Sequence, residues 1–220
     1  MKKKIAVLVA MGMEADCLIK RIENARTEKA GGRTFLRGTV GSAEVVLYRC
    51  GWGMRRAADG ARALIGYARP DALLLYGVSG AIVPTLRIAD TVVAEASFAT
   101  WGKAFAAGLS QPTDETLANF AAGVLGEAQK APVATSVGVI LRKKRNARIA
   151  AASGALCTDM ESYAVAKAAA ELDMPLLVIR SISDTFERIS LLAFLKNGKI
   201  AAERAALDTE TVIKALAENP

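Results

Sequence analysis

Three acidic side chains, Glu14, Glu161 and Asp184, occur at places in this sequence where carboxylates can take part in chemistry. Glu14 and Asp184 follow apolar runs that predict buried strands, and Glu161 stands shortly before the second of these runs. The chain of 220 residues contains no histidine, which excludes catalysis by a Ser-His-Asp triad or a Cys-His pair. Acid–base chemistry must therefore come from carboxylates, lysine, tyrosine or cysteine.

Each of these carboxylates also has a structural explanation, and spacing alone leaves both explanations open. Thr158 and Glu161 have the spacing of a capping box, in which the glutamate only satisfies backbone donors at the start of a helix. Asp184, followed by Glu187, can cap a short helix in the same way. Glu14 suits the first turn of a helix, where the helix dipole favours an acid.

Two glycine-containing segments are weaker candidates for ligand binding. Gly77 and Gly80 follow a buried run and allow either close approach to a ligand or a plain turn. Residues 51–53 (GWG) precede a predicted helix and can present backbone N–H groups to an anion, with Arg55 and Arg56 nearby. The sequence has neither a GxGxxG fingerprint nor a Walker loop, so dinucleotide and nucleoside triphosphate binding lack support.

The spacing of apolar residues predicts the elements that position these side chains. Strands are expected over residues 4–10, 33–40, 44–50, 71–76, 90–96, 133–140 and 175–179. Helices are expected over residues 13–24, 54–68, 114–125, 143–152, 159–172 and 202–217. This order predicts a single α/β domain over residues 1–220, in which a mixed, mostly parallel sheet is flanked by helices. Ligands of such sheets bind at the carboxyl ends of the strands, here residues 11–14, 77–80 and 181–184.

Composition narrows the class of protein. With 52% hydrophobic and 23% charged residues, the chain is typical of a globular protein. Its three cysteines have no paired spacing, so we expect neither a disulfide framework nor a metal site. No apolar run reaches the ~18 residues of a membrane helix, and no signal peptide is evident, so the expected location is cytoplasmic.

The net charge is +7, and the densest basic cluster is the run 142–145 with Arg148 after it. A nucleic-acid surface and a solvated helical turn both explain such a run. Aromatic residues do not interleave with it and no nucleic-acid motif surrounds it, which favours the solvated turn. We therefore expect no nucleic-acid partner.

Several segments resemble, in the same order, signatures of the purine nucleoside phosphorylase and methylthioadenosine/S-adenosylhomocysteine nucleosidase superfamily. They are residues 10–15 (AMGMEA), 77–81 (GVSGA), 84–90 (PTLRIAD), 157–162 (CTDMES) and 180–184 (RSISD). The resemblance implies a three-layer, nucleoside phosphorylase-like fold and cleavage of the N-glycosidic bond of a purine nucleoside. It implies no cofactor, with phosphate as co-substrate in the phosphorylases only. By analogy it also implies a homo-oligomer, either a dimer or a trimer.

The resemblance assigns roles to individual residues. Asp184 matches the general acid at N7 of the leaving purine, and Glu14 matches the residue that positions the attacking water. Glu161 matches the carboxylate that binds the ribose hydroxyls, and Met160 the side chain that packs under the sugar. The remaining substrate-binding positions implied are Met11, Ser79, Gly80, Ile140 and Leu141.

The sequence departs from the family where the phosphorylases bind phosphate. Residues 11–13 contain no arginine, and Val78 stands where many members carry serine. These departures favour water as the nucleophile and hydrolysis of an adenosine-type nucleoside. Phosphorolysis stays the alternative, with Arg55 and Arg56 as the possible phosphate ligands. A family member that binds a nucleoside as a sensor, without catalysis, is a third hypothesis.

Two further departures concern the substrate. The segment between residues 96 and 133 is short for the family, which would leave room for a bulky 5′ substituent. The region 159–184 is similar to the hopanoid-associated branch, whose members release adenine from an adenosylated lipid. Gly138 stands where relatives often carry an aspartate that contacts the base, so the base specificity stays open.

Overall fold

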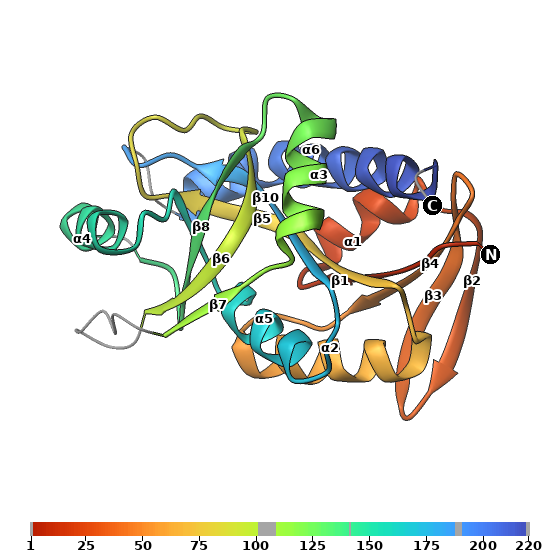
Figure 1. Ribbon diagram of the computed structural model, residues 1–220. Coiled ribbons are helices and arrows are strands. Elements are labelled where there is room, and N and C mark those ends of the chain that lie inside the picture. The colour runs from red at the N-terminus through yellow and green to blue at the C-terminus, as the bar shows by residue number, and fades with distance from the viewer. Residues whose placement is uncertain (1, 101–108, 141, 188–190, 219–220) are drawn as a thin grey trace.

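The computed structural model describes residues 2–100, 109–140, 142–187 and 191–218, which form one mixed sheet between layers of helices (Figure 1). The strands are β1 (Lys4–Val9), β2 (Glu23–Ala30), β3 (Arg33–Val40), β4 (Ala43–Arg49), β5 (Ala72–Ala81), β6 (Thr91–Thr100), β7 (Ser110–Pro112), β8 (Gln129–Ser136), β9 (Cys157–Asp159) and β10 (Leu176–Asp184). The helices are α1 (Gly12–Ile19), α2 (Met54–Ala68), α3 (Glu115–Leu125), α4 (Lys143–Ser153), α5 (Ser162–Ala170) and α6 (Leu191–Glu218).

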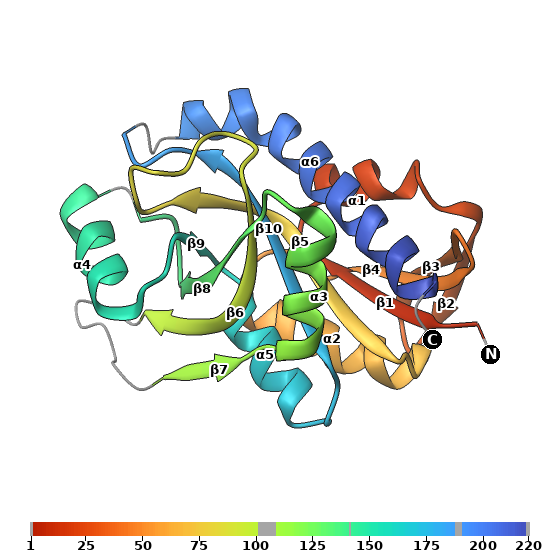
Figure 2. The same ribbon diagram turned by 45° about the horizontal axis from the view of Figure 1, so that its top comes forward.

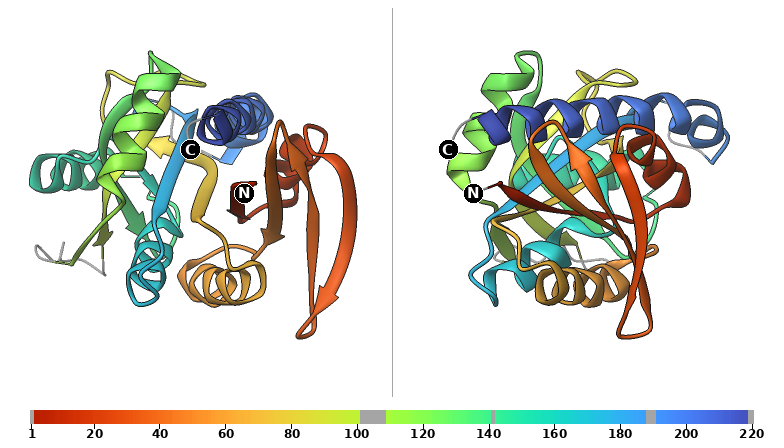
Figure 3. Two further views of the ribbon diagram at one scale, coloured as in Figure 1. Left: turned by 45° about the vertical axis from the view of Figure 1, so that its right-hand side comes forward. Right: turned by 90° about the vertical axis from the view of Figure 1, so that its right-hand side faces the viewer.

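The centre of the sheet is built from strands that are buried on both faces. β1 is parallel to both β4 and β5, and β5 is in turn parallel to β10. β5 also pairs with β9, and the pairings of β10, β6, β8, β9 and β5 close into a ring. The β2–β3 hairpin extends the opposite edge, as the two views of Figure 3 show. Continuous apolar runs form the central strands because neither face of them meets water.

Helices cover the two faces of the sheet through separate cores. Ile5, Val7 and Val9 of β1 face a cluster shared with α1, α3 and α6. Ala6 and Leu8 face the opposite cluster, which contains α2 and α5. This alternation follows from the two-residue period of a strand. The predicted fold class, an α/β domain with helices on both faces of a mixed sheet, is confirmed.

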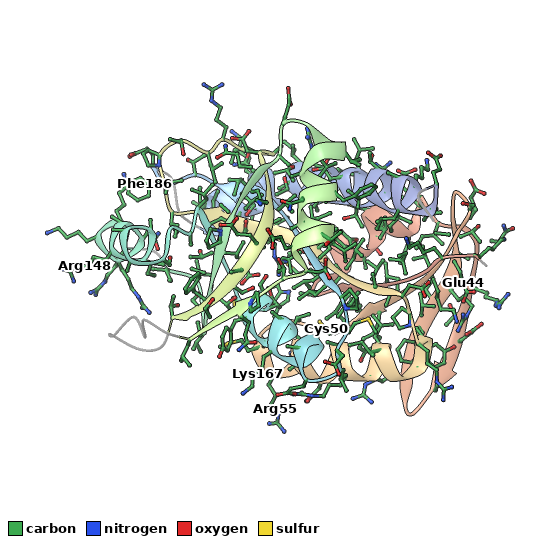
Figure 4. All side chains as sticks on the ribbon, viewed as in Figure 1. Glu44, Cys50, Arg55, Arg148, Lys167 and Phe186 are labelled. Carbon is green, nitrogen blue, oxygen red and sulfur yellow. The ribbon has the colours of Figure 1, made fainter. Side chains whose placement is uncertain are left out.

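Helix α4 stands apart at the end of the sheet beside β8 and β9 (Figure 2). It packs on a small cluster that includes Ile82, Ile140 and Ile149. The basic run 142–145 and Arg148 are exposed to solvent, and Figure 4 shows Arg148 pointing away from the body of the protein. The interpretation of this run as a solvated helical turn therefore agrees with its exposure.

Several sequence-based boundaries were wrong. The first helix was predicted to reach residue 24 but ends at Ile19, and the exposed strand β2 begins at Glu23. Residues 77–80 and 181–184 were predicted to follow their strands, yet β5 and β10 continue through them. The two strands pair from Leu73–Leu176 to Gly80–Asp184. This long-range pairing keeps the glycine segment extended.

Candidate active site

A cavity of about 390 Å³ lies where β1, β5 and β10 end. Its volume is in the range typical of small-molecule sites, about 300–1,000 Å³. Most residues predicted from the sequence border it, namely Met11, Glu14, Ser79, Gly80, Ile140, Met160, Glu161 and Asp184. The rule that ligands bind at the carboxyl ends of strands thus located the cavity correctly.

Glu14 connects the start of α1 with the end of β5. Its Oε2 accepts a hydrogen bond from the Met11 N–H at 2.8 Å, and its Oε1 accepts one from the Val78 N–H at 2.9 Å. A side chain at Gly77 would place a Cβ 2.5 Å from Oε1, so glycine is required there. Glu14 therefore does contribute to the helix start, as the structural explanation proposed, but it also lies buried at the cavity.

Burial raises the pKa of Glu14 to about 7, against the opposing effects of the Val78 hydrogen bond and the Arg180 charge. A carboxyl group with such a pKa exists in both protonation states near neutral pH. It can therefore accept a proton from water, which an ordinary surface glutamate does poorly.

Glu161 is positioned by contacts with the backbone and with a buried arginine. Its Oε1 accepts a hydrogen bond from the Gly53 N–H at 2.9 Å, and its Oε2 lies 3.8 Å from Nη2 of Arg180. Burial raises the pKa of Glu161, and the Arg180 charge opposes this effect. The backbone N–H of Gly53 was expected to face an external anion, but the anion that it meets is this carboxylate.

The capping-box explanation of Glu161 is wrong. Glu161 is the N-cap residue of α5, and its side chain makes no capping hydrogen bond. The carboxylate of Asp159 performs that task instead by accepting from the Ser162 N–H at 3.1 Å. The side chain of Glu161 is thereby left at the cavity.

Asp184 ends β10 beside the glycine of the neighbouring strand. The Ser183 hydroxyl donates to Asp184 Oδ1 at 2.8 Å. A Cβ at Gly80 would lie 2.7 Å from Oδ2, so glycine provides the space for this carboxyl group. Burial raises the pKa of Asp184 above its ordinary value, although the Ser183 hydrogen bond opposes the effect. An acid that retains its proton more readily is suited to proton donation.

Arg180 and Asp159 are two buried charged residues for which no role was predicted from the sequence. Arg180 is 1% exposed, and its Nη2 lies 2.5 Å from Asp159 Oδ2. The same atom lies 3.1 Å from the Ser162 hydroxyl. An arginine inside a continuous buried strand is itself a signal, because a buried charge requires a partner of opposite sign. Other cavity residues that were missed are Trp52, Ser136, Val139, Asn146, Thr158, Ser183 and Phe194.

The predicted phosphate ligands do not border this cavity. Arg55 and Arg56 are exposed on α2, and Figure 4 shows Arg55 pointing away from the protein. Within the described ranges, the cavity lining contains neither arginine nor lysine.

Leu141, predicted to contact the base, lies outside the described residues. Among the residues whose placement is described, no group of His, Cys, Asp and Glu could hold a metal ion.

Comparison with known protein families shows to which family the chain belongs. Residues 4–214 match the family model of the phosphorylase superfamily. The chain belongs to this superfamily. The family predicted from the motifs is thereby confirmed, and so is the prediction of an enzyme of the nucleosidase or nucleoside phosphorylase type. In the described part of this phosphorylase-superfamily chain, no helix has the length and apolar character needed to cross a membrane.

Solved structures agree with the family assignment. The chain is 26% identical to the 5′-methylthioadenosine/S-adenosylhomocysteine nucleosidase of S. pneumoniae, with a TM-score of 0.86 over 97% of this chain and 99% of the other. It is 24% identical to the S-adenosylhomocysteine nucleosidase of Streptococcus pyogenes, with a TM-score of 0.89 over 98% of each chain. It is 21% identical to the futalosine hydrolase of Helicobacter pylori, with a TM-score of 0.88 over 97% and 98%.

Proposed function

We propose that this protein hydrolyses the N-glycosidic bond of an adenosine-type purine nucleoside and releases the free base. The observation that carries the proposal is that three buried carboxyl groups, those of Glu14, Glu161 and Asp184, border one cavity. Burial raises the pKa of each above its ordinary value. The nucleosidases among the similar structures support the same class of reaction.

Glu161 stabilises the sugar during bond cleavage in this proposal. Breaking the bond builds positive charge on the ribose, and a carboxylate beside it favours that charged state over the ground state. The hydrogen bond from Gly53 and the nearby Arg180 fix the position of this carboxylate. The ribose hydroxyls then lie against Glu161 and the ring against Met160.

Asp184 and Glu14 carry out the two proton transfers of the hydrolysis, one to the leaving base and one from the attacking water. Asp184 donates its proton to N7 of the purine, because the base is a poor leaving group without it. Glu14 accepts a proton from the attacking water, whose oxygen bonds to the anomeric carbon as the bond to the base breaks. Each group has a pKa raised towards the working pH, which is the condition for effective proton transfer.

Phosphorolysis of the same bond is the second candidate reaction. A phosphate would need cationic or N–H donors, and the Gly53 N–H already donates to Glu161. Arg55 and Arg56 are the cationic residues predicted from the sequence to bind it, and their exposure away from the cavity supports water as the nucleophile.

The rim of the cavity bears on the 5′ substituent and on assembly. Trp52 and Val139 border the cavity yet are 59% and 72% exposed. This apolar rim supports, as an alternative substrate, a nucleoside with a large apolar 5′ group such as an adenosylated lipid of the hopanoid-associated branch.

We expect a cytoplasmic dimer or trimer in which a neighbouring subunit approaches this rim. Light scattering of the purified protein tests the subunit number.

Base release from a nucleoside panel, with and without phosphate, tests the proposed reaction. We expect free base from adenosine or 5′-methylthioadenosine without phosphate. Asp184→Asn should lower kcat by about 10²–10⁴-fold, the usual contribution of a general acid. Arg55→Gln should leave the rate unchanged. Turnover that requires phosphate and falls in Arg55→Gln would establish phosphorolysis instead, and unchanged activity of Asp184→Asn would exclude the acid role.

A further inference from the structure

Asn146 is a buried polar residue at the cavity that the proposed reaction does not use. It lies in the first turn of α4, borders the cavity and is 1% exposed. Its Oδ1 is buried and has no hydrogen-bond partner among the described residues. Buried side-chain oxygens without a partner are uncommon in folded proteins, and one at a ligand site indicates that the ligand supplies the donor.

The backbone fixes which end of the Asn146 amide is available. Nδ2 donates a hydrogen bond to the carbonyl oxygen of Ile140 at 3.2 Å. Reversal of the amide would bring two oxygen atoms together, so Oδ1 must be the end turned away from Ile140. Ile140 itself borders the cavity, which places this amide at the cavity wall.

The sheet topology places Asn146 on the Asp184 side of the cavity. Thr158 of β9 pairs with Gly80 of β5 on one side and with Ala134 of β8 on the other. Asp184 packs on Gly80, and the segment that leads to Asn146 follows β8. Glu14 is held instead by the N–H of Val78, two residues before Gly80 in β5, and Glu161 by the N–H of Gly53 in the loop after β4. In the proposed reaction, the side with Glu14 and Glu161 would meet the sugar and the attacking water, and the side with Asp184 would meet the base.

We propose that Asn146 is a base-specificity residue whose Oδ1 accepts a hydrogen bond from the exocyclic amino group at C6 of an adenine-type base. This inference rests on the proposed function, because it assumes that Asp184 addresses N7. N7 and the C6 substituent lie on the same edge of a purine, so one side of the cavity can contact both. A base that carries no hydrogen-bond donor at C6 would leave Oδ1 buried and unpaired, which disfavours binding of that base.

The test compares two substrates in three proteins. The substrates are adenosine and purine riboside, which lacks the amino group. The proteins are the wild type, Asn146→Leu, and the control Ser97→Ala. Ser97 is also fully buried with an unpartnered hydroxyl among the described residues, but it does not border the cavity. The quantity measured is kcat/KM for base release, with KM and kcat separated.

We expect the ratio of kcat/KM for adenosine over purine riboside to fall about tenfold in Asn146→Leu, the size of one buried hydrogen bond. The change should appear mainly in KM, and Ser97→Ala should keep the wild-type ratio. Asn146→Ala, which a helix accepts readily, replaces the leucine variant if that variant does not fold.

Four results would overturn the inference or its basis. An unchanged ratio in a folded Asn146 variant, or an equal loss with both substrates, would assign Asn146 a structural role. A wild-type preference for inosine over adenosine would show that the donor is not the amino group. Failure of the wild type to release base from any purine nucleoside would instead reject the proposed function, and is distinguishable because it precedes any comparison of variants.

Discussion

Two clusters in this molecule bring one arginine together with several carboxylates. At the cavity, Arg180 meets Asp159 and Glu161, and its side chain is 1% exposed. On the surface between α1 and α6, Arg21 meets Glu203 at 3.1 Å and Glu210 at 3.0 Å, and its side chain is 28% exposed. The residue types are the same, but the second cluster is far more exposed to solvent.

The pKa of Glu161 at the cavity and the pKa values of Glu203 and Glu210 at the surface are shifted in opposite directions. At the cavity, burial raises the pKa of Glu161, and Arg180 opposes this without reversing it. At the surface, partial burial acts in the same direction, but the neighbouring hydrogen bonds and positive charges together outweigh it. The hydrogen bond from Arg21 leads this effect at Glu203, and those from Lys214 and Arg21 lead it at Glu210, so the pKa of each glutamate is lowered. Solvent access therefore decides whether such a cluster holds its carboxylates ionised or prepares them for proton transfer.

The largest expected effect comes from removing the central arginine of each cluster. Arg180→Met should lower the free energy of unfolding by about 3–5 kcal/mol, because it leaves buried carboxylates without a counter-charge. Arg21→Met should lower it by about 1 kcal/mol or less, as for partly exposed ion pairs. Urea unfolding monitored by circular dichroism measures both values.

A matched double variant sharpens this comparison. Arg180→Met combined with Asp159→Asn removes both members of the 2.5 Å pair, and it should be more stable than Arg180→Met alone. Equal losses of stability in Arg180→Met and Arg21→Met would contradict the distinction between the two clusters.

The features of this protein that could be predicted from the sequence are those that depend on local residue patterns. The amphipathic helix 54–68 was predicted with its observed boundaries because its apolar spacing is a local property. The exposed strand β2 was missed because its charged residues carry no apolar alternation. Glu14 follows the strand that the apolar run 4–10 predicted, whereas Asp184 is the last residue of β10 and does not follow it.

Contacts between distant segments could not be predicted in this way. The Arg180–Asp159 pair forms only because β10 and β9 both border β5. Asn146 lies within a basic, helical stretch that predicts an exposed turn, yet it is buried and donates to the carbonyl oxygen of Ile140 at the cavity wall. Burial of a polar residue depends on tertiary packing, which the local pattern does not contain.

The next effect concerns how stability depends on pH. The pKa of Glu14 is about 7 in the folded protein and its ordinary value is 4.5. The stability associated with protonated Glu14 is therefore fully present below the ordinary value and is lost as the pH rises through about 7. Relative to Glu14→Gln, the wild type should lose on the order of 3 kcal/mol between about pH 4 and about pH 8. Chemical unfolding of both proteins at several pH values measures this difference.

The surface cluster supplies the control with the opposite sign. Glu203 has a lowered pKa, so its ionised form stabilises the fold and this stability is lost as the pH falls. The wild type should therefore gain stability relative to Glu203→Gln as the pH rises. If the stability difference from the wild type changed with pH in the same direction for Glu14→Gln and Glu203→Gln, burial would not explain the difference between the two sites.

The smallest expected effect is on the pH dependence of the rate. Hydrolysis needs Glu14 ionised to accept the proton of water, so the Glu14 pKa of about 7 should produce a limb along which kcat/KM rises with pH by up to about tenfold per unit. Base release measured from about pH 5 to about pH 9 gives the profile. Glu14→Gln should lose the rising limb, and Glu203→Gln should keep it. Loss of that limb in Glu14→Gln alone would assign the pKa near 7 to the buried carboxyl group of Glu14. A limb caused by acid unfolding would instead persist in both variants.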